Sequence, residues 1–95
     1  MENQKYIVRC YGAGVFYAEI GHREGKEAEL INARRLWYWD GAASLSQLAL
    51  EGVSKPQNCK FTVTVPSLIV TDVIEIIPCS EAACMSIDGV PTWKM

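Results

Sequence analysis

The stretch VFYAEIGHREGKEAELINARRLWYWD, residues 15–40, carries the clearest strand pattern in the chain and decides the expected fold. In residues 15–20 the side chains alternate between two faces, with Val15, Tyr17 and Glu19 on one and the even-numbered residues on the other. Residues 21–25 are polar with a glycine at each end, which predicts a turn. Residues 27–32 predict the returning strand, so we expect a hairpin over residues 15–32.

Further strands are predicted on both sides of this hairpin. Residues 5–11 are rich in β-branched and aromatic side chains, and the glycines that follow predict a hairpin turn or a bulge. Residues 60–65 alternate cleanly, and we expect Phe61, Val63 and Val65 to point inward. Pro66 and Ser67 are expected to end that strand. One or two more strands are expected in residues 68–77, before Pro78.

Two short helices are predicted from their capping residues. Ser44 and Gln47 fit a capping box, and Gly52 supplies a stop about two turns later. Ser80 is the expected N-cap of a second helix over residues 80–87. Between them, residues 53–58 predict a polar loop. The C-terminal residues 90–95 contain a tryptophan, so we expect this tail to pack on the body of the protein.

The size and composition predict one small globular domain over residues 1–95. Of the 95 residues, 49% are hydrophobic and 21% are charged, which is ordinary for a folded protein. The expected class is α+β and β-rich, with about five or six mainly antiparallel strands and one or two short helices. A domain of this length has a small core and marginal stability.

Charge and cysteine usage exclude several classes of function. The formal charge of −2 argues against binding to long nucleic acid, which uses a basic surface. The four cysteines form no CxxC pair and the chain has one histidine, so we expect free buried thiols and neither a metal site nor a cofactor. The chain contains no catalytic motif, and we expect no enzyme. Residues 1–5 are polar and no segment approaches the ~20 apolar residues of a membrane helix, so the expected setting is cytosol.

Residues 34–40 combine arginine, tryptophan, tyrosine and aspartate in a way that suits a flat anionic ligand. A nucleobase gains about 1–3 kcal/mol by stacking on an aromatic ring, and arginine binds phosphate through two parallel hydrogen bonds. The helix start at Ser44 adds free backbone N–H groups that favour an anion. The expected ligand-binding residues are Arg34, Arg35, Trp37, Tyr38, Trp39, Ser44, Lys55 and Lys60.

Two other roles for this segment remain open from the sequence. The aromatic side chains can fill the core of a small domain, with Arg34 and Arg35 paired to Asp40 or Glu51 at the surface. They can also anchor a homo-oligomer, because tryptophan, tyrosine and arginine dominate interface hot spots. If the segment is extended, Arg35, Trp37 and Trp39 share one face, and Arg34, Leu36, Tyr38 and Asp40 share the other.

Residues 32–49, NARRLWYWDGAASLSQLA, resemble a family of small proteins of tailed bacteriophages and prophages that is known as a domain of unknown function. Residues 52–56, 59–61 and 73–78 extend the resemblance over nearly the whole chain. It implies an accessory phage protein made in the host bacterial cytoplasm, and it carries over no catalytic residues. By analogy, unrelated phage proteins of this size form oligomers that sequester nucleotide immune signals.

These observations lead to one main hypothesis and two alternatives. The main hypothesis is a non-enzymatic homo-oligomer that binds and sequesters a small anionic nucleotide-like molecule, a sponge for a host-defence signal. The first alternative is a protein–protein interaction module or inhibitor that uses the Trp-Tyr-Trp face. The second is a structural component of the virion.

Overall fold

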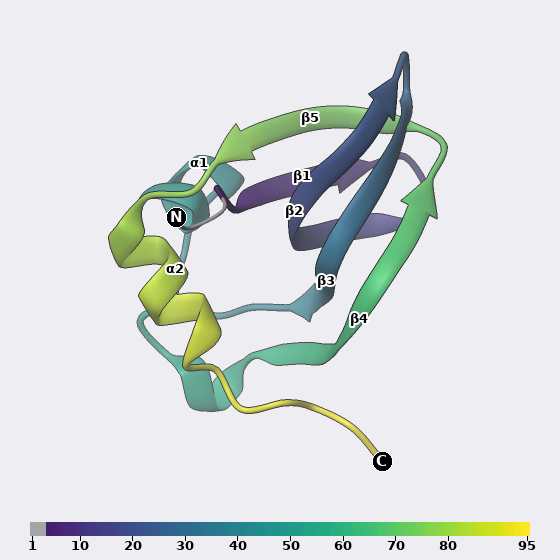
Figure 1. Cartoon of the computed structure of the whole chain (residues 1–95). Helices are drawn as coiled ribbons and strands as arrows, with labels where there is room; N and C mark the ends of the chain where they lie inside the picture. The colour runs from purple at the N-terminus through teal and green to yellow at the C-terminus, as the bar shows by residue number, and fades with distance from the viewer. Residues whose placement is uncertain (1–3) are drawn as a thin grey trace.

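Five antiparallel strands form one sheet in the order β4-β3-β2-β1-β5 within residues 4–95, the part of the chain that the computed structural model describes (Figure 1). Two helices, α1 and α2, and a short 3-10 turn complete the fold, which confirms the predicted β-rich α+β class. The expected domain begins at residue 1, and its first three residues lie outside the described part. The elements are β1 (Tyr6–Cys10), β2 (Gly14–Glu24), β3 (Glu27–Tyr38), α1 (Leu45–Glu51), η1 (Pro56–Asn58), β4 (Lys60–Val70), β5 (Val73–Pro78) and α2 (Glu81–Asp88).

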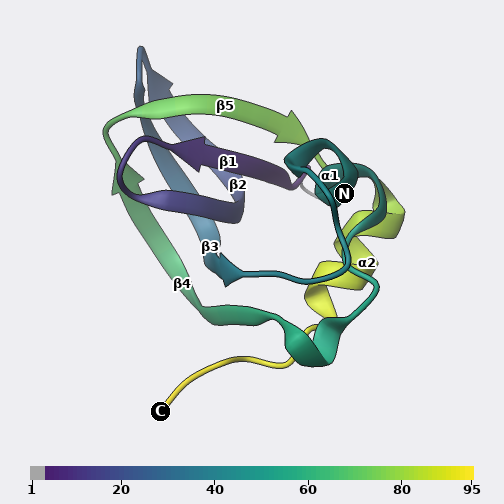
Figure 2. The ribbon, with the colours of Figure 1, turned by 180° about the vertical axis from the view of Figure 1, so that it is seen from behind.

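The sheet is strongly curled, because its two edge strands are consecutive in the chain. β4 and β5 lie at opposite edges, yet only residues 71 and 72 separate them. At this corner the Tyr11 N–H donates to the carbonyl of Asp72, and the Val73 N–H donates to the carbonyl of Lys26, both at 2.9 Å. In Figures 1 and 2, β5 arches across the top of the sheet from this corner toward the helices.

The curl produces two apolar clusters, one on each face of the sheet. The first contains residues from all five strands and none from a helix, and Val8, Phe16 and Leu30 at its centre are fully buried. The sheet thus closes over its own apolar side chains. The second cluster lies under the two helices and includes Tyr17 and Leu48. Phe16 and Tyr17 therefore face opposite clusters, as the alternation in residues 15–20 predicts.

Two of the predicted strand ends are wrong. β2 continues through the expected turn to Glu24, and the chain reverses at Gly25, where φ is 59°. His22 therefore lies on a strand, where it is exposed. Pro66 does not end β4, which runs without interruption to Val70. β4 is an edge strand, and an edge tolerates proline because one row of its N–H groups has no partner strand.

The predicted alternation of residues 60–65 also fails in part. Phe61 is buried, but Val63 is 46% exposed. The pairing explains this, because Arg34 lies opposite Thr64 whereas Leu36 lies opposite Phe61, so β4 carries one extra residue between these pairs. Such a bulge changes the face to which the following side chains point. The Thr62 hydroxyl at the bulge accepts a hydrogen bond from the Arg35 N–H at 3.1 Å.

Both helix caps and the docked tail agree with the sequence predictions. The Ser44 hydroxyl accepts from the Gln47 N–H at 3.1 Å, and the Ser80 hydroxyl accepts from the Ala83 N–H at 3.0 Å. The tail returns to the start of β4, where the Trp93 N–H donates to the carbonyl of Phe61 at 2.8 Å. In residues 4–95 neither helix has the length and apolar character needed to span a membrane.

Candidate functional site

The aromatic–arginine segment forms the last part of β3, and its side chains divide between the two faces as far as Trp37. Arg34 and Leu36 are buried on the helix side, whereas Arg35 and Trp37 are exposed. The predicted alternation ends there, because β3 carries an irregularity between Leu36 and Tyr38. Tyr38 is exposed rather than buried beside Leu36. Trp39 follows the strand and packs, half-buried, against the cluster that contains Leu36.

Arg34 is part of the protein interior and is 6% exposed. Its Nε donates to the carbonyl of Thr62 at 2.9 Å, its Nη1 to Ile87 at 2.9 Å and its Nη2 to Val90 at 2.7 Å. Burial lowers the pKa of the guanidinium, and the nearby Asp88 opposes this effect. Arg34 thus ties β3 to β4, to the end of α2 and to the tail. The expected roles of Arg34, pairing with a surface carboxylate or binding phosphate, do not match these contacts with backbone carbonyls.

The exposed side chains gather into a surface that we call the tryptophan patch, made of Arg35, Trp37, Tyr38, Lys60 and Trp93. The indoles of Trp37 and Trp93 are nearly parallel, with 16° between their planes and 6.4 Å between their centres. Lys60 Nζ lies 5.5 Å from the centre of the Trp93 ring. Tyr38 and Lys60 are backbone neighbours in the sheet. Trp93 was missed as a site residue, and its tail position was the signal that it packs on the body.

A cavity of about 270 Å³ lies beside the patch. Its walls are the turn at residues 12–14, Val15, residues 35–37 at the end of β3, and Trp39 just after the strand. Arg35 also lies over the ring of Phe16, with its guanidinium carbon 4.8 Å from the ring centre. A cationic group and an exposed indole therefore open onto the same hollow. These two groups can contact a planar anion by charge pairing and by stacking.

The expected anion site at Ser44 is occupied by contacts within the chain. The Ser44 hydroxyl caps the Gln47 N–H, and the Gln47 side-chain oxygen accepts from the Ala43 N–H at 2.7 Å. Lys55 is exposed, and its carbonyl accepts from the Asn58 N–H at 3.0 Å. Within residues 4–95 the contacts of Ser44 and Lys55 do not include the tryptophan patch. The structure brings together four of the eight expected residues there: Arg35, Trp37, Tyr38 and Lys60.

Two of the four cysteines, Cys10 and Cys79, are poor nucleophiles because they are buried. All four are free thiols, with Cys10, Cys59 and Cys79 buried and Cys84 half-buried. Burial raises the pKa of Cys79 to about 12 and also raises the pKa of Cys10. A thiol with a raised pKa holds little of the reactive thiolate near neutral pH. In residues 4–95 no group of three or more His, Cys, Asp or Glu side chains could hold a metal ion.

Alkylation with iodoacetamide at neutral pH is expected to modify Cys84 first and Cys79 at least roughly tenfold more slowly, because Cys79 is buried and its pKa is raised. Cleavage after Glu75 and Glu81 places Cys79 and Cys84 in separate peptides, so mass spectrometry of a digest at glutamate over time measures both rates. The unfolded protein in guanidinium is the control, in which the two thiols should react alike. Faster labelling of Cys79 in the folded protein would contradict the burial described above.

The chain belongs to the family described as Domain of unknown function (DUF6948), whose model matches residues 3–87. This confirms the expected membership of a family of unknown function over nearly the whole chain. Comparison with curated proteins and comparison with solved structures both returned no match.

Proposed function

We propose that this member of the DUF6948 family is a non-enzymatic protein that binds a small anionic, nucleotide-like molecule at the tryptophan patch. The observation that carries the proposal is the position of Trp37, which is 65% exposed and shares the hollow of about 270 Å³ with Arg35. The base would stack on the indole of Trp37, and Arg35 and Lys60 would hold the phosphate.

The exposure of two tryptophans supports a binding role over a core role. A tryptophan can bury about 150–250 Å² of surface, and a domain of 95 residues has few other ways to enlarge its core. Trp37 and Trp93 nevertheless leave 65% and 43% of their surface in solvent. Trp39, two residues further along, does pack against the core. Trp37 and Trp93 therefore remain exposed where Trp39 is packed against the core.

The proposed site differs from the expected one in its cations. Arg34 donates to three carbonyls and is only 6% exposed, so Arg35 and Lys60 take the phosphate-binding role in this proposal. Ser44 and Lys55 contribute only if a second protomer brings them near. Pockets for drug-sized ligands measure about 300–1,000 Å³. A hollow slightly below that range leaves part of a nucleotide uncovered, which supports a homo-oligomer whose second copy covers it.

The biological setting is proposed from the sequence resemblance to proteins of tailed bacteriophages and prophages. In that setting the protein acts in the cytoplasm of the infected bacterium and sequesters a nucleotide-like defence signal without cleaving it. The tryptophan patch suits this role because stacking and charge pairing bind such a molecule without any catalytic group.

Trp37→Ala is expected to weaken nucleotide binding by roughly 5- to 150-fold, the equivalent of losing about 1–3 kcal/mol of stacking. Isothermal titration against cyclic and linear nucleotides measures the affinity. Quenching of tryptophan fluorescence reports the stacking directly, because Trp37 and Trp93 are the exposed indoles. The matched control is Met85→Ala, which removes an exposed side chain from α2 and should leave binding unchanged.

The proposal fails if none of the nucleotides gives heat, or if Trp37→Ala binds as tightly as the wild type. Arg35→Ala tests the phosphate contact separately, with Arg23→Ala as an exposed arginine outside the patch. Loss of affinity in Arg35→Ala alone, with circular dichroism unchanged, supports the charge contact independently of the stacking contact.

The second candidate function is a protein–protein interaction through the same patch. Exposed tryptophan, tyrosine and arginine side chains at one place match the composition of interface hot spots. This candidate predicts that the wild type, and not Trp37→Ala, retains one protein partner from infected cells. It also predicts that nucleotides do not displace that partner.

A further inference from the structure

A second cavity, separate from the tryptophan patch, lies on the helix side of the sheet and measures about 180 Å³. We call it the Tyr17 cavity. Polar side chains from distant parts of the chain line it: Lys5 before β1, Tyr17 on β2, Asn32 on β3, Thr64 on β4 and Asp88 at the end of α2. It shares no lining residue with the hollow beside Trp37.

Tyr17 lines this cavity, and its buried hydroxyl makes no hydrogen bond of good geometry within the protein. Tyr17 is 2% exposed, and within residues 4–95 its hydroxyl is the buried side-chain polar atom with no partner at hydrogen-bonding distance and angle, although the Cys84 thiol and the Asp88 carboxylate lie near it. Burial raises the pKa of Tyr17, and the nearby Cys84 and Asp88 raise it further, so the group remains a donor. Nearly all buried polar groups in native proteins are paired, and an exception indicates a specific role.

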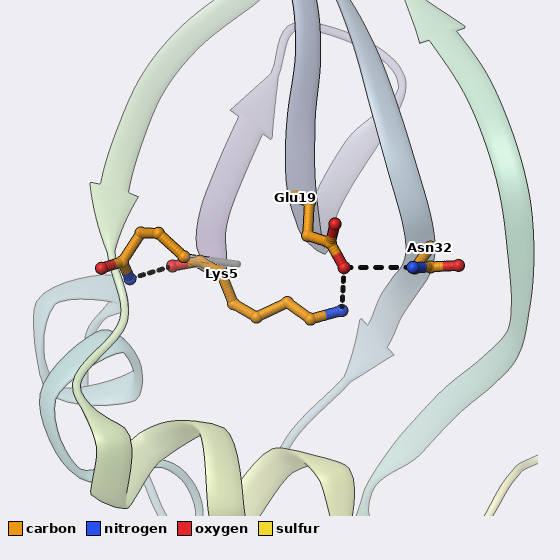
Figure 3. A network of polar contacts seen from close by, with 4 residues as sticks. Lys5, Glu19 and Asn32 are labelled. Carbon is orange, nitrogen blue, oxygen red and sulfur yellow. Dashed lines mark hydrogen bonds and ion pairs between the residues drawn. The ribbon is translucent and has the colours of Figure 1, made fainter. Parts of the chain in front are cut away.

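Both signs of charge surround the cavity. Lys5 Nζ lies 3.4 Å from the Glu19 carboxylate, which also accepts from the Asn32 amide at 3.0 Å (Figure 3). An ammonium has three N–H donors, so the contact with Glu19 leaves Lys5 further capacity. Arg34 also borders the cavity, and its guanidinium donates to neutral carbonyls rather than to a carboxylate. Asp88, the last residue of α2, is exposed and supplies a negative charge to the cavity wall.

An irregularity in β3 orients the wall that carries Asn32. Tyr17 lies opposite Arg34, but Glu19 lies opposite Ile31, so β3 carries one extra residue here. Asn32 occupies the extra position with φ of 51°, a left-handed conformation that asparagine tolerates better than most residues. Bulges of this kind redirect a side chain and are frequent next to binding sites. Here the bulge accompanies the contact between the Asn32 amide and Glu19.

We propose that the Tyr17 cavity binds a small zwitterion of the free α-amino acid class. Its carboxylate accepts from the Tyr17 hydroxyl and from Lys5, and its ammonium contacts Asp88. The balance of charges argues against a dianion or a dication, and the polar lining argues against an apolar ligand. A cavity of about 180 Å³ has the volume of about six water molecules, well below the range of pockets for drug-sized ligands.

Matched small molecules test both ends of the zwitterion. Glycine, alanine, serine, threonine and aspartate are titrated into the ¹⁵N-labelled protein, and chemical-shift changes at Tyr17, Asn32 and Asp88 are followed. Lactate replaces the ammonium of alanine by a hydroxyl, and alaninol replaces its carboxylate. We expect at least one amino acid to bind, and the hydroxy acid and amino alcohol with the same side chain (lactate and alaninol for alanine) to bind at least roughly tenfold more weakly. Absence of binding by all five, or equal binding of the analogues, overturns the proposal.

Tyr17→Phe and Asp88→Asn test the assigned contacts. Tyr17→Phe removes the unpaired hydroxyl, so we expect an unchanged or higher Tm and loss of amino-acid binding. Asp88 is exposed, so the Asp88→Asn variant should fold normally. We expect this variant to lose the preference for alanine over lactate. Tyr11→Phe, an exposed tyrosine outside the cavity, is the control. A Tyr17→Phe variant that binds like the wild type, or that loses several degrees in Tm, overturns the role of the hydroxyl.

Discussion

Arg34→Met is expected to lower the free energy of unfolding by about 3–5 kcal/mol, because it leaves three interior carbonyls without their donor. These belong to Thr62, Ile87 and Val90, at 2.9, 2.9 and 2.7 Å from the guanidinium nitrogens. Small domains are stable by about 5–15 kcal/mol, so the variant should be close to unfolding at room temperature. Urea denaturation followed by circular dichroism measures the loss.

The neighbouring arginine provides the control for this prediction. Arg35→Met changes the same side chain one residue further along, but Arg35 is exposed and lies over the ring of Phe16. A cation–π contact at an exposed site contributes about 0.5–1 kcal/mol, so Arg35→Met should be far milder. Equal losses in the two variants would refute the view that Arg34 holds β4, α2 and the tail together.

Gly52→Ala is expected to destabilise the protein by about 3–5 kcal/mol, through backbone strain and steric overlap acting together. Gly52 ends α1 with φ of 76°, a conformation that disfavours a side chain. A methyl group there would overlap the side chain of Ser86 on α2. The Ser86 hydroxyl accepts from the Val53 N–H at 3.0 Å and donates to the Val53 carbonyl at 3.1 Å, so moving Ser86 also breaks the bonds that join α2 to the segment after α1.

Gly12→Ala separates the two causes. Gly12 also has a positive φ, 84°, but nothing lies within 4 Å of the position that its methyl group would take. It should therefore show only the strain, about 1 kcal/mol. Thermal denaturation of both variants gives the comparison. If Gly12→Ala loses as much stability as Gly52→Ala, then overlap with Ser86 is not the main cause.

The sequence predicted the elements whose signals are local. The alternation in residues 15–20 assigned Phe16 and Tyr17 to opposite faces, and both serine caps act where the capping pattern expects them. The continuation of β4 through Pro66 was not predictable in this way. It depends on β4 lying at the edge of the sheet, and the strand order is a property of the whole chain.

The candidate site was predicted only in part, because some of its contacts depend on residues far apart in the chain. Alternation along β3 correctly separated Arg34 from Arg35 and Trp37. The role of Arg34 could not be predicted, because its acceptors lie 28, 53 and 56 residues further along the chain. The exposure of Val63 and of Tyr38 follows from irregularities in strand pairing, which a single-strand pattern does not contain. Tyr17 carries the signature of a core residue, and its unpaired hydroxyl is visible only in three dimensions.

The edge position of Pro66 has a consequence for how copies of this protein can associate. An unprotected edge strand is a template to which another chain can add by backbone hydrogen bonds, the first step of runaway aggregation. Proline has no N–H to offer an incoming strand, and the bulge near Thr62 disturbs the same strand four residues earlier. β4 is therefore a poor template along its length. An incoming strand would find no regular row of backbone N–H donors along this edge of the sheet.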